Sequence, residues 1–560
     1  MNLPQAALAT LVVSMLALVS TPSIAAARDG ADCAESPGAV VADLKRAPDG
    51  RVAVDYRFAT PVTCVRFSDA SPIRAPSWHF ENPDASLMVD GVTVVIRTPV
   101  THLRVDIDDS VKDGQFDRVY TPMIRFKDGS SVAVYSEYLM MDRDFAATTL
   151  HVDAGDDAHG RASTPTFDSK RPRTYLVLGT PATRSFGEDA VVSDRSLPPA
   201  LVSEIERAVG FAEADFGAMR LDQARTTLLI ISDAHESSRT TWRGDTLAGL
   251  VRLDFSGPGW DAMSPELGRD VQHFVAHEMF HLVNAHVVDQ SAGDGMLSLV
   301  EGSAEAAADF TLFRHGLLDR GQFDERREMA VKLCMRIAGA TLSEKERNNV
   351  AQAPYACGDA LANLLASATG ASGAEPNDYF RLWALVRKRT GSGDYGWPDV
   401  FAAARSLSAP NADAALHVLE DIVDSRTSWD DGLHALQQAG LLKAVDSDEA
   451  RKPWRSEYFA GVAISRMLGA RCRARRGYTR VGDVYQLDAP AESCEGVPDG
   501  FALVSIAGHR LADDGLAAVQ ALGSECATRG DVEIADKAGL GRQVACGPMP
   551  STPQFYRFVR

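Results

Sequence analysis

Apolar and polar residues alternate over short distances in the first third of the chain. Residues 92–98 and 131–135 are Val-containing runs, and the dipeptides Asp90-Gly91 and Asp128-Gly129 precede them. Short alternating runs bounded by turn-forming dipeptides are typical of antiparallel strands joined by hairpins. We therefore expect an N-terminal β-sandwich-like domain over residues 28–170, with a linker rich in Gly and Pro at residues 153–173.

The pattern changes after this linker to a mixture of strands and helices. Residues 175–179 and 226–232 are apolar runs typical of buried strands, and residues 198–216 form a helical pattern that begins with proline. From Pro265 to about Leu442, apolar residues recur every three or four positions, which predicts helices throughout. A second domain is thus expected over residues 171–465, with an α/β lobe to about residue 290 and a helical lobe after it.

Short strands return near the C-terminus, at residues 483–487 and 501–508, followed by a short helix around residues 515–522. These elements predict a third domain over residues 466–560. The chain as a whole is expected to be a multidomain α+β protein, which agrees with its length of 560 residues.

The first 27 residues have the pattern of an export signal. An apolar run from Ala6 to Val19 is too short to span a bilayer, and Pro22 and a small-residue stretch follow it. The segment before the run has no Lys or Arg, so an uncleaved anchor is the alternative. We expect a periplasmic or secreted protein, with no stable membrane insertion after cleavage of residues 1–27.

Composition narrows the class of partner. The chain has 57 Lys and Arg against 76 Asp and Glu, a formal net charge of −19. Such a surface repels phosphate backbones and anionic lipids, which argues against nucleic acid or a membrane face as the main partner. With 45% hydrophobic and 24% charged residues, the composition is that of a folded globular protein.

The predicted export would place the eight cysteines in an oxidising compartment. An even number in an oxidising compartment indicates disulfides, and the cysteines fall into four sequential couples. The predicted pairs are Cys33 with Cys64, Cys334 with Cys357, Cys472 with Cys494, and Cys526 with Cys546.

The segment His277-Glu278-Met279-Phe280-His281 carries the candidate chemistry. On a helix, residues four apart lie on the same face, so His277 and His281 can offer two imidazole nitrogens to one Zn²⁺. Glu278 then lies beside the water that a metal polarises, as a general base requires. This HExxH pattern predicts a hydrolytic zinc site with one ion per chain.

A hydrolytic zinc needs a third protein ligand and one open position. A turn-rich break at residues 289–295 is followed by a helix that contains Glu301 and, one turn later, Glu305. We expect Glu301 to be the third ligand, and Glu305 to accept the outer N–H of a liganding histidine.

Other interpretations of these residues stay open. His273 lies on the same face as His277, so a metal pair of these two is geometrically allowed, and His286 is expected at the surface or outside the ligand set. Glu305 is alternatively a solvated helix residue. A chain that kept this helix but lost the metal would be a catalytically silent peptide-binding scaffold.

Three segments resemble the gluzincin metallopeptidases: residues 277–284, residues 299–302, and Tyr355-Ala356-Cys357-Gly358. The sequence is most similar to the glycyl aminopeptidase family, whose members combine a thermolysin-like catalytic domain with a PDZ domain. The resemblance covers roughly residues 170–450. It implies a thermolysin-like zincin domain with a helical lobe, a C-terminal PDZ-like domain, and peptide or unfolded protein as substrate. It also implies that Tyr355 donates a hydrogen bond to the oxyanion.

One departure from the family concerns substrate recognition. The family has a Gly-Leu-Glu-His sequence before the motif, whose acid is expected to hold the free amine of the substrate. This chain has Leu247, Ala248, Gly249, Leu250, Val251 and Arg252 there. A cationic Arg252 pointing into the cleft would repel an N-terminal ammonium. Aminopeptidase and endopeptidase action are therefore both open.

The PDZ-like segment, residues 482–511, also has two interpretations. PDZ modules bind a peptide as an added strand. A disulfide-stapled packing module that binds nothing is the alternative.

Overall fold

The computed structural model describes residues 33, 38–47, 50–69, 71, 73–110, 120–142, 145–153, 166–168, 173–220, 226–233, 240–247, 249–284, 295–337, 339–349, 352–370, 375–391, 394–408, 412–445, 453–469, 477–481, 483–488, 497, 500–546 and 555–559. They form two compact units, one within residues 33–284 and one within residues 295–559. The predicted signal segment and the predicted Cys472–Cys494 pair lie outside the described residues. None of the described helices combines the length and hydropathy that a bilayer crossing requires.

The first unit begins with a sheet in the order β3-β5-β2-β1-β8-β9, with β4 paired to β5. Its strands are β1 (Ala39–Arg46), β2 (Val52–Arg66), β3 (Trp78–Phe80), β4 (Ala85–Leu87), β5 (Thr93–Ile107), β8 (Ala147–Asp153) and β9 (Thr166–Asp168), and the short helices α1 (Arg74–Ser77) and α2 (Ser136–Leu139) lie between strands. The strand predicted at residues 92–98 is part of β5. The expectation of an all-antiparallel sheet was wrong at one pair, because β1 and β8 run parallel.

A second, three-stranded sheet contains β6 (Met123–Arg125), β7 (Ser131–Tyr135) and β10 (Tyr175–Gly179). The structure confirms the strands predicted at residues 131–135 and 175–179. Apolar side chains of this sheet form one core with Leu229, Ile231, Leu247 and Leu250 of a third sheet. The second sheet therefore covers one face of the third.

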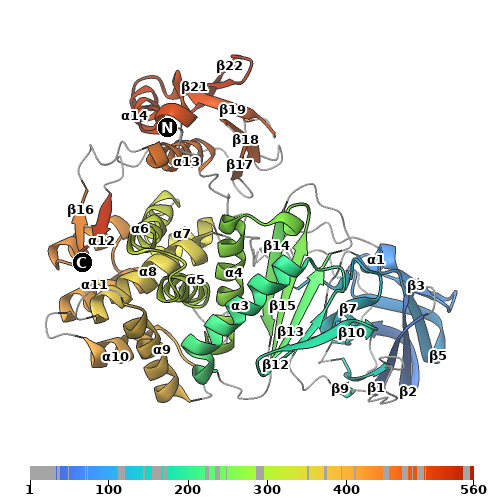
Figure 1. The fold of residues 1–560 in the computed structure, drawn as a ribbon. Helices are drawn as coiled ribbons and strands as arrows, with labels where there is room; N and C mark the ends of the chain where they lie inside the picture. The colour runs from blue at the N-terminus through green and yellow to red at the C-terminus, as the bar shows by residue number, and fades with distance from the viewer. Residues whose placement is uncertain are drawn as a thin grey trace. The chain divides into compact units, whose positions relative to one another are not determined.

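The third sheet has the order β11-β12-β13-β15-β14, with β14 at its edge. Its strands are β11 (Ala182–Phe186), β12 (Asp189–Ser193), β13 (Thr227–Ser232), β14 (Thr241–Leu247) and β15 (Leu250–Ser256). Helices α3 (Pro199–Phe216) and α4 (Pro265–Asn284) pack against each other, and α4 contacts β14 and β15 (Figure 1). The short 3-10 helices η1 (Gly217–Met219) and η2 (Trp260–Ala262) follow α3 and β15.

The second unit starts with the predicted helical lobe. It contains α5 (Met296–Arg314), α6 (Arg320–Arg336), α7 (Leu342–Asn348), α8 (Ala353–Thr369), α9 (Pro376–Thr390), α10 (Trp397–Leu407), α11 (Asp413–Val423) and α12 (Trp429–Gln438). Figure 1 shows α5, α6 and α8 side by side. The prediction of helices from Pro265 to about Leu442 is confirmed for the described residues.

The C-terminal part of this unit contains a sheet in the order β17-β18-β19-β21-β22, with β20 paired to β19. Its elements are α13 (Pro453–Gly469), β17 (Gly477–Val481), β18 (Val484–Asp488), β19 (Ala502–Ile506), β20 (His509–Arg510), α14 (Leu511–Arg529), β21 (Asp531–Asp536) and β22 (Gly541–Ala545). Helices α13 and α14 share one apolar core with these strands. We call residues 453–546 the C-terminal module.

The last described strand leaves this module. β23 (Tyr556–Phe558) pairs antiparallel with β16 (Leu442–Ala444), which directly follows the helical lobe. The backbone N–H of Val445 also donates to the carbonyl of Phe555 at 2.9 Å. The two chain segments that connect to the C-terminal module are therefore hydrogen-bonded to each other.

The three predicted disulfides whose cysteines are described are all present. Cys33 is bonded to Cys64, Cys334 to Cys357, and Cys526 to Cys546. The second bond joins α6 to α8 and is two residues from Tyr355.

Candidate metal centre

Helix α4 presents the histidines of the motif. The helix begins after Ser264, whose hydroxyl accepts the backbone N–H of Leu267 at 3.2 Å, and Pro265 occupies its first turn. A Ser cap followed by proline is a common helix start. The serine oxygen accepts one of the N–H groups that have no partner within the helix, and proline has no N–H group. Val271, Val275, Met279 and Val283 then bury one face of α4, which fixes the rotation of the helix about its axis.

His277 and His281 lie one turn apart and are both buried. Their Nε2 atoms are 3.1 Å from each other, and the two rings meet nearly at right angles, with centroids 4.8 Å apart. Two neutral imidazoles whose lone pairs converge repel each other unless a proton or a cation lies between them. This arrangement therefore suits either a shared proton or a bound cation.

Asn284 orients the second histidine. Its Oδ1 atom is 2.9 Å from Nδ1 of His281, and Asn284 is fully buried. An amide oxygen accepts only, so Nδ1 of His281 carries the proton and Nε2 offers its lone pair. This role was not predicted from the sequence, although the spacing of three residues from His281 on one helix was the available signal.

Glu278 is also buried, at 7% exposure. Thr246 of β14 donates its hydroxyl hydrogen to the backbone carbonyl of Glu278 at 2.7 Å, and the same hydroxyl is 3.3 Å from Oε2 of that residue. The carboxyl group thus lies between α4 and the edge strand of the sheet. Neither Thr246 nor Gly244, which also packs against Glu278, was singled out from the sequence.

Among the described residues, the potential metal ligands form one group of three: His277, His281 and Glu301. One donor atom of each lies within 4.8 Å of the others. His273 is buried on α4 but is not a member of this group, and His286 lies outside the described residues.

The group fits zinc by its chemistry, and its two histidines fit zinc also by their spacing. Two imidazoles and one carboxylate are ligands that Zn²⁺ accepts, and two nitrogens at about 2.0–2.1 Å from a tetrahedral zinc stand roughly 3.3 Å apart. The observed separation of the two Nε2 atoms, 3.1 Å, is close to this value.

Helices α5 and α8 carry Glu301 and Tyr355, and they touch backbone to backbone. A Cβ atom on Gly302 would lie 1.9 Å from the carbonyl carbon of Gly358, and one on Gly358 would lie 2.1 Å from the backbone oxygen of Ser298. Glu301 directly precedes the first glycine, and Tyr355 is one turn before the second. Both residues are half-buried.

Glu305 belongs to a row of acids between the same two helices. Its charge, with that of Asp309, acts on the half-buried Asp359 of α8. Desolvation of Asp359, together with these charges, raises its pKa well above the ordinary value. Arg326 bonds Asp309 at 2.8 Å, and the amide of Asn363 donates to Asp359 at 2.7 Å. The predicted bond of Glu305 to a liganding histidine stays a prediction, and for His281 the outer nitrogen already faces Asn284.

Arg252 does not project into an open cleft. The structure buries it fully, where it pairs with Asp245 and lies 3.3 Å from Asp254. It also donates to the hydroxyl of Tyr175 and stacks over that ring at 4.6 Å. The residues before it do not form one strand, because Gly249, with φ at +71°, makes the turn between β14 and β15.

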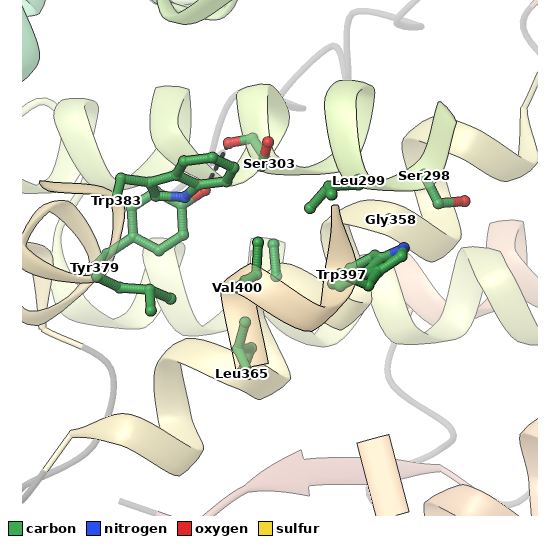
Figure 2. Close-up of a pocket in the computed structure, with 11 residues that line it drawn as sticks. Ser298, Leu299, Ser303, Gly358, Leu365, Tyr379, Trp383, Trp397 and Val400 are labelled. Atoms are coloured by element: carbon green, nitrogen blue, oxygen red, sulfur yellow. Dashed lines mark hydrogen bonds between the residues drawn. The ribbon is translucent and has the colours of Figure 1, made fainter. Parts of the chain in front are cut away.

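A small pocket lies within the helical lobe. Figure 2 shows it among α5, α8, α9 and α10, where the hydroxyl of Tyr379 donates to the carbonyl of Ser303 at 2.6 Å. Its lining is mostly apolar: Ser298, Leu299, Ser303, Gly358, Ala362, Leu365, Tyr379, Leu382, Trp383, Trp397 and Val400. A lining without acids, bases or histidines offers no hydrolytic chemistry.

Solved structures with some likeness to this chain include an aminopeptidase N family protein from Idiomarina loihiensis, with a TM-score of 0.49 and 10% sequence identity over 93% of this chain and 98% of that chain. A two-domain M1 zinc metallopeptidase variant bound to L-tryptophan has a TM-score of 0.39 and 11% identity, over 69% of this chain and 94% of that chain. No protein-family model and no curated protein matches the sequence. The residues of this chain therefore carry the evidence for its function.

Proposed function

We propose that this chain is an exported zinc metallopeptidase that hydrolyses peptide bonds of peptides or unfolded protein. The observation that carries the proposal is the group of His277, His281 and Glu301, with one donor atom of each within 4.8 Å of the others. These three residues would hold the ion. Zinc in such a site supplies Lewis-acid activation of water and of the amide carbonyl.

The remaining steps belong to side chains of the chain. Glu278 accepts a proton from the attacking water and passes it to the nitrogen of the leaving amine, so that the broken C–N bond leaves a neutral amine. The phenol of Tyr355 donates a hydrogen bond to the carbonyl oxygen as negative charge develops on it. Asn284 holds His281 in the tautomer that keeps Nε2 available.

An aminopeptidase-like action follows from the resemblance, and an endopeptidase is the alternative. The burial of Arg252 between Asp245 and Asp254 removes the expected repulsion of a substrate ammonium by this residue. The chain nevertheless has Leu247 and Arg252, and no acid, at the two ends of the segment where the family carries one. Aminopeptidase action thus needs a free-amine partner from elsewhere in the chain.

The test combines metal analysis with hydrolysis of a peptide library by the purified full chain and by Glu278→Gln. We expect about one zinc per chain in both proteins, and a loss of activity in the variant of about 100-fold or more, the scale of a general base. Absence of stoichiometric zinc, or equal cleavage by the variant, would contradict the proposal and favour a silent scaffold. Sequencing of the products separates removal of N-terminal residues from internal cleavage.

A further inference from the structure

The edge strand β14 presents alternate residues to helix α4. Side chains alternate between the two faces of a strand, so Trp242, Gly244 and Thr246 share one face. The ring of Trp242 lies 6.5 Å from that of Phe274, while Gly244 and Thr246 both contact Glu278. One face of β14 therefore packs along α4 and reaches the proposed general base.

Gly244 leaves space for the carboxyl group. A Cβ atom on this residue would come within 2.4 Å of both the carboxyl carbon and Oε1 of Glu278, and within 2.6 Å of its Cγ atom. Real Cβ atoms essentially never approach heavy atoms so closely. Gly244 has no positive φ angle, so its backbone does not require glycine. The requirement comes from the side chain of Glu278.

Thr246 supplies a bond to the same residue. Its hydroxyl donates to the backbone carbonyl of Glu278 at 2.7 Å and stands 3.3 Å from Oε2. The hydroxyl thus connects the sheet edge to the turn of α4 that bears the base. A valine at this position would keep the shape of the side chain and lose the donor.

We propose that Gly244 and Thr246 are positioning residues that hold the carboxyl group of Glu278 in its working orientation. The proposal rests on the zinc peptidase function above, because it assigns Glu278 its role. Neither residue takes part in the chemistry. Gly244 permits one placement of the carboxyl group, and Thr246 fixes the distance between β14 and α4 at that point. An error of 1 Å in the placement of a catalytic group costs roughly 100-fold in rate.

The first test compares Thr246→Val with Thr246→Ser in the full chain. We expect the valine variant to lose about 5-fold in kcat with KM unchanged, the scale of one lost hydrogen bond, and the serine variant to stay within about 2-fold. Zinc content should match that of the wild type, and the stability of the valine variant should fall by about 1 kcal/mol, the cost of one lost hydrogen bond. Thr241→Val is the matched control, because Thr241 is on β14 but bonds Ser256 at 2.7 Å.

A double-mutant cycle separates this role from a general structural one. In the background of Glu278→Gln, Thr246→Val should lower the residual kcat by less than about 2-fold, because it acts through Glu278. Equal losses in both backgrounds, equal losses for valine and serine, or unchanged kcat in Thr246→Val would overturn the positioning role. If Glu278→Gln itself retains full activity, the proposed function fails instead, whatever Thr246 does.

Gly244→Ala provides a readout that does not depend on activity. A crystal structure of this variant should show the carboxyl group of Glu278 moved away from β14, with both histidines in place. Its kcat should fall by about 100-fold. An unmoved carboxyl group would contradict the inference. If this variant does not fold, the Thr246 pair decides the question.

Discussion

Gly302 and Gly358 bring helices α5 and α8 into direct backbone contact. A Cβ on the first would overlap the backbone of the second, and a Cβ on the second would overlap the backbone of α5 at Ser298. Neither glycine has a positive φ angle. Close approach, and not backbone conformation, therefore explains both residues. Glu301 and Tyr355 stand on either side of this contact.

Gly302→Ala should separate the two helices. Overpacking of this kind costs about 1–3 kcal/mol, which urea unfolding can measure. Because Glu301 and Tyr355 move apart with their helices, kcat should fall as well. Gly210→Ala is the control, because Gly210 is an exposed residue of α3 where an added Cβ atom would meet no heavy atom within 4 Å. It should gain roughly 0.5–1 kcal/mol from helix propensity. If Gly302→Ala changed neither the free energy of unfolding nor kcat, the contact between the two helices would be loose.

Tyr355→Phe tests the oxyanion role. Loss of one donor to a developing oxyanion costs about 100- to 1000-fold in kcat, and KM should change little. Tyr379→Phe is a buried control, because its hydroxyl bonds the carbonyl of Ser303 on α5. That change should lower stability by about 1 kcal/mol and leave kcat near the wild-type value. Similar kcat values for Tyr355→Phe and the wild type would remove Tyr355 from the mechanism.

The disulfide of the helical lobe and that of the C-terminal module should differ in their effect on activity. Cys334–Cys357 closes a separation of 23 residues and Cys526–Cys546 one of 20, so removing either by double alanine substitution should cost about 3 kcal/mol of stability. The first bond is next to Tyr355, so its loss alone should lower kcat. Assays below the unfolding temperature of both variants test this. Equal kcat in the two variants would contradict it.

Arg252→Met should be strongly destabilising. It removes the cation between Asp245 and Asp254 and leaves the buried carboxyl group of Asp245 and the half-buried one of Asp254 without it, a change that costs about 3–5 kcal/mol. Arg207→Met, which breaks the exposed pair with Glu204 on α3, should cost less than about 1 kcal/mol. Denaturant unfolding at constant pH measures both. Comparable costs would mean that solvent reaches Arg252.

Asp254, beside Arg252, should make the free energy of unfolding depend on pH. Burial, assisted by Asp233 and Asp245, raises the pKa of Asp254 to about 7, although Arg252 opposes the shift. The folded state then binds a proton that the unfolded state releases near its ordinary pKa of about 3.9. This contribution is fully present below that value and is lost as the pH rises through about 7. Relative to Asp254→Asn, the wild type should lose stability between about pH 4 and 7. If the free energy of unfolding of the wild type and of Asp254→Asn changed equally with pH, the raised pKa of Asp254 would be contradicted.

The local pattern of apolar residues predicted the strands of this chain better than it predicted how the strands pair. The short apolar runs at residues 131–135 and 175–179 became strands, since few other structures bury so many apolar residues over so short a length. The parallel pairing of β1 with β8, by contrast, joins residues far apart in the sequence, such as Ala39 and Ala147. No local signal reports such a pairing.

The candidate site likewise has residues that the sequence predicts and residues that depend on tertiary packing. The spacing of His277, Glu278 and His281 predicts their common helix face, because helix geometry alone decides it. The roles of Thr246 and Gly244 depend on the packing of α4 against β14, which spacing does not encode. Arg252 was considered as a residue of the cleft because it lies where the family carries its Gly-Leu-Glu-His sequence, whereas its partners include Tyr175 from a different sheet.

The pairing of β16 with β23 has a further meaning for the C-terminal module. Lys443 stands opposite Arg557, and Ala444 opposite Tyr556, so the chain leaves for the module and returns from it at neighbouring points. Opposite residues of an antiparallel pair are only about 4.5–5.5 Å apart. The module is thus topologically an insertion, and its excision leaves two ends that a tight turn can rejoin.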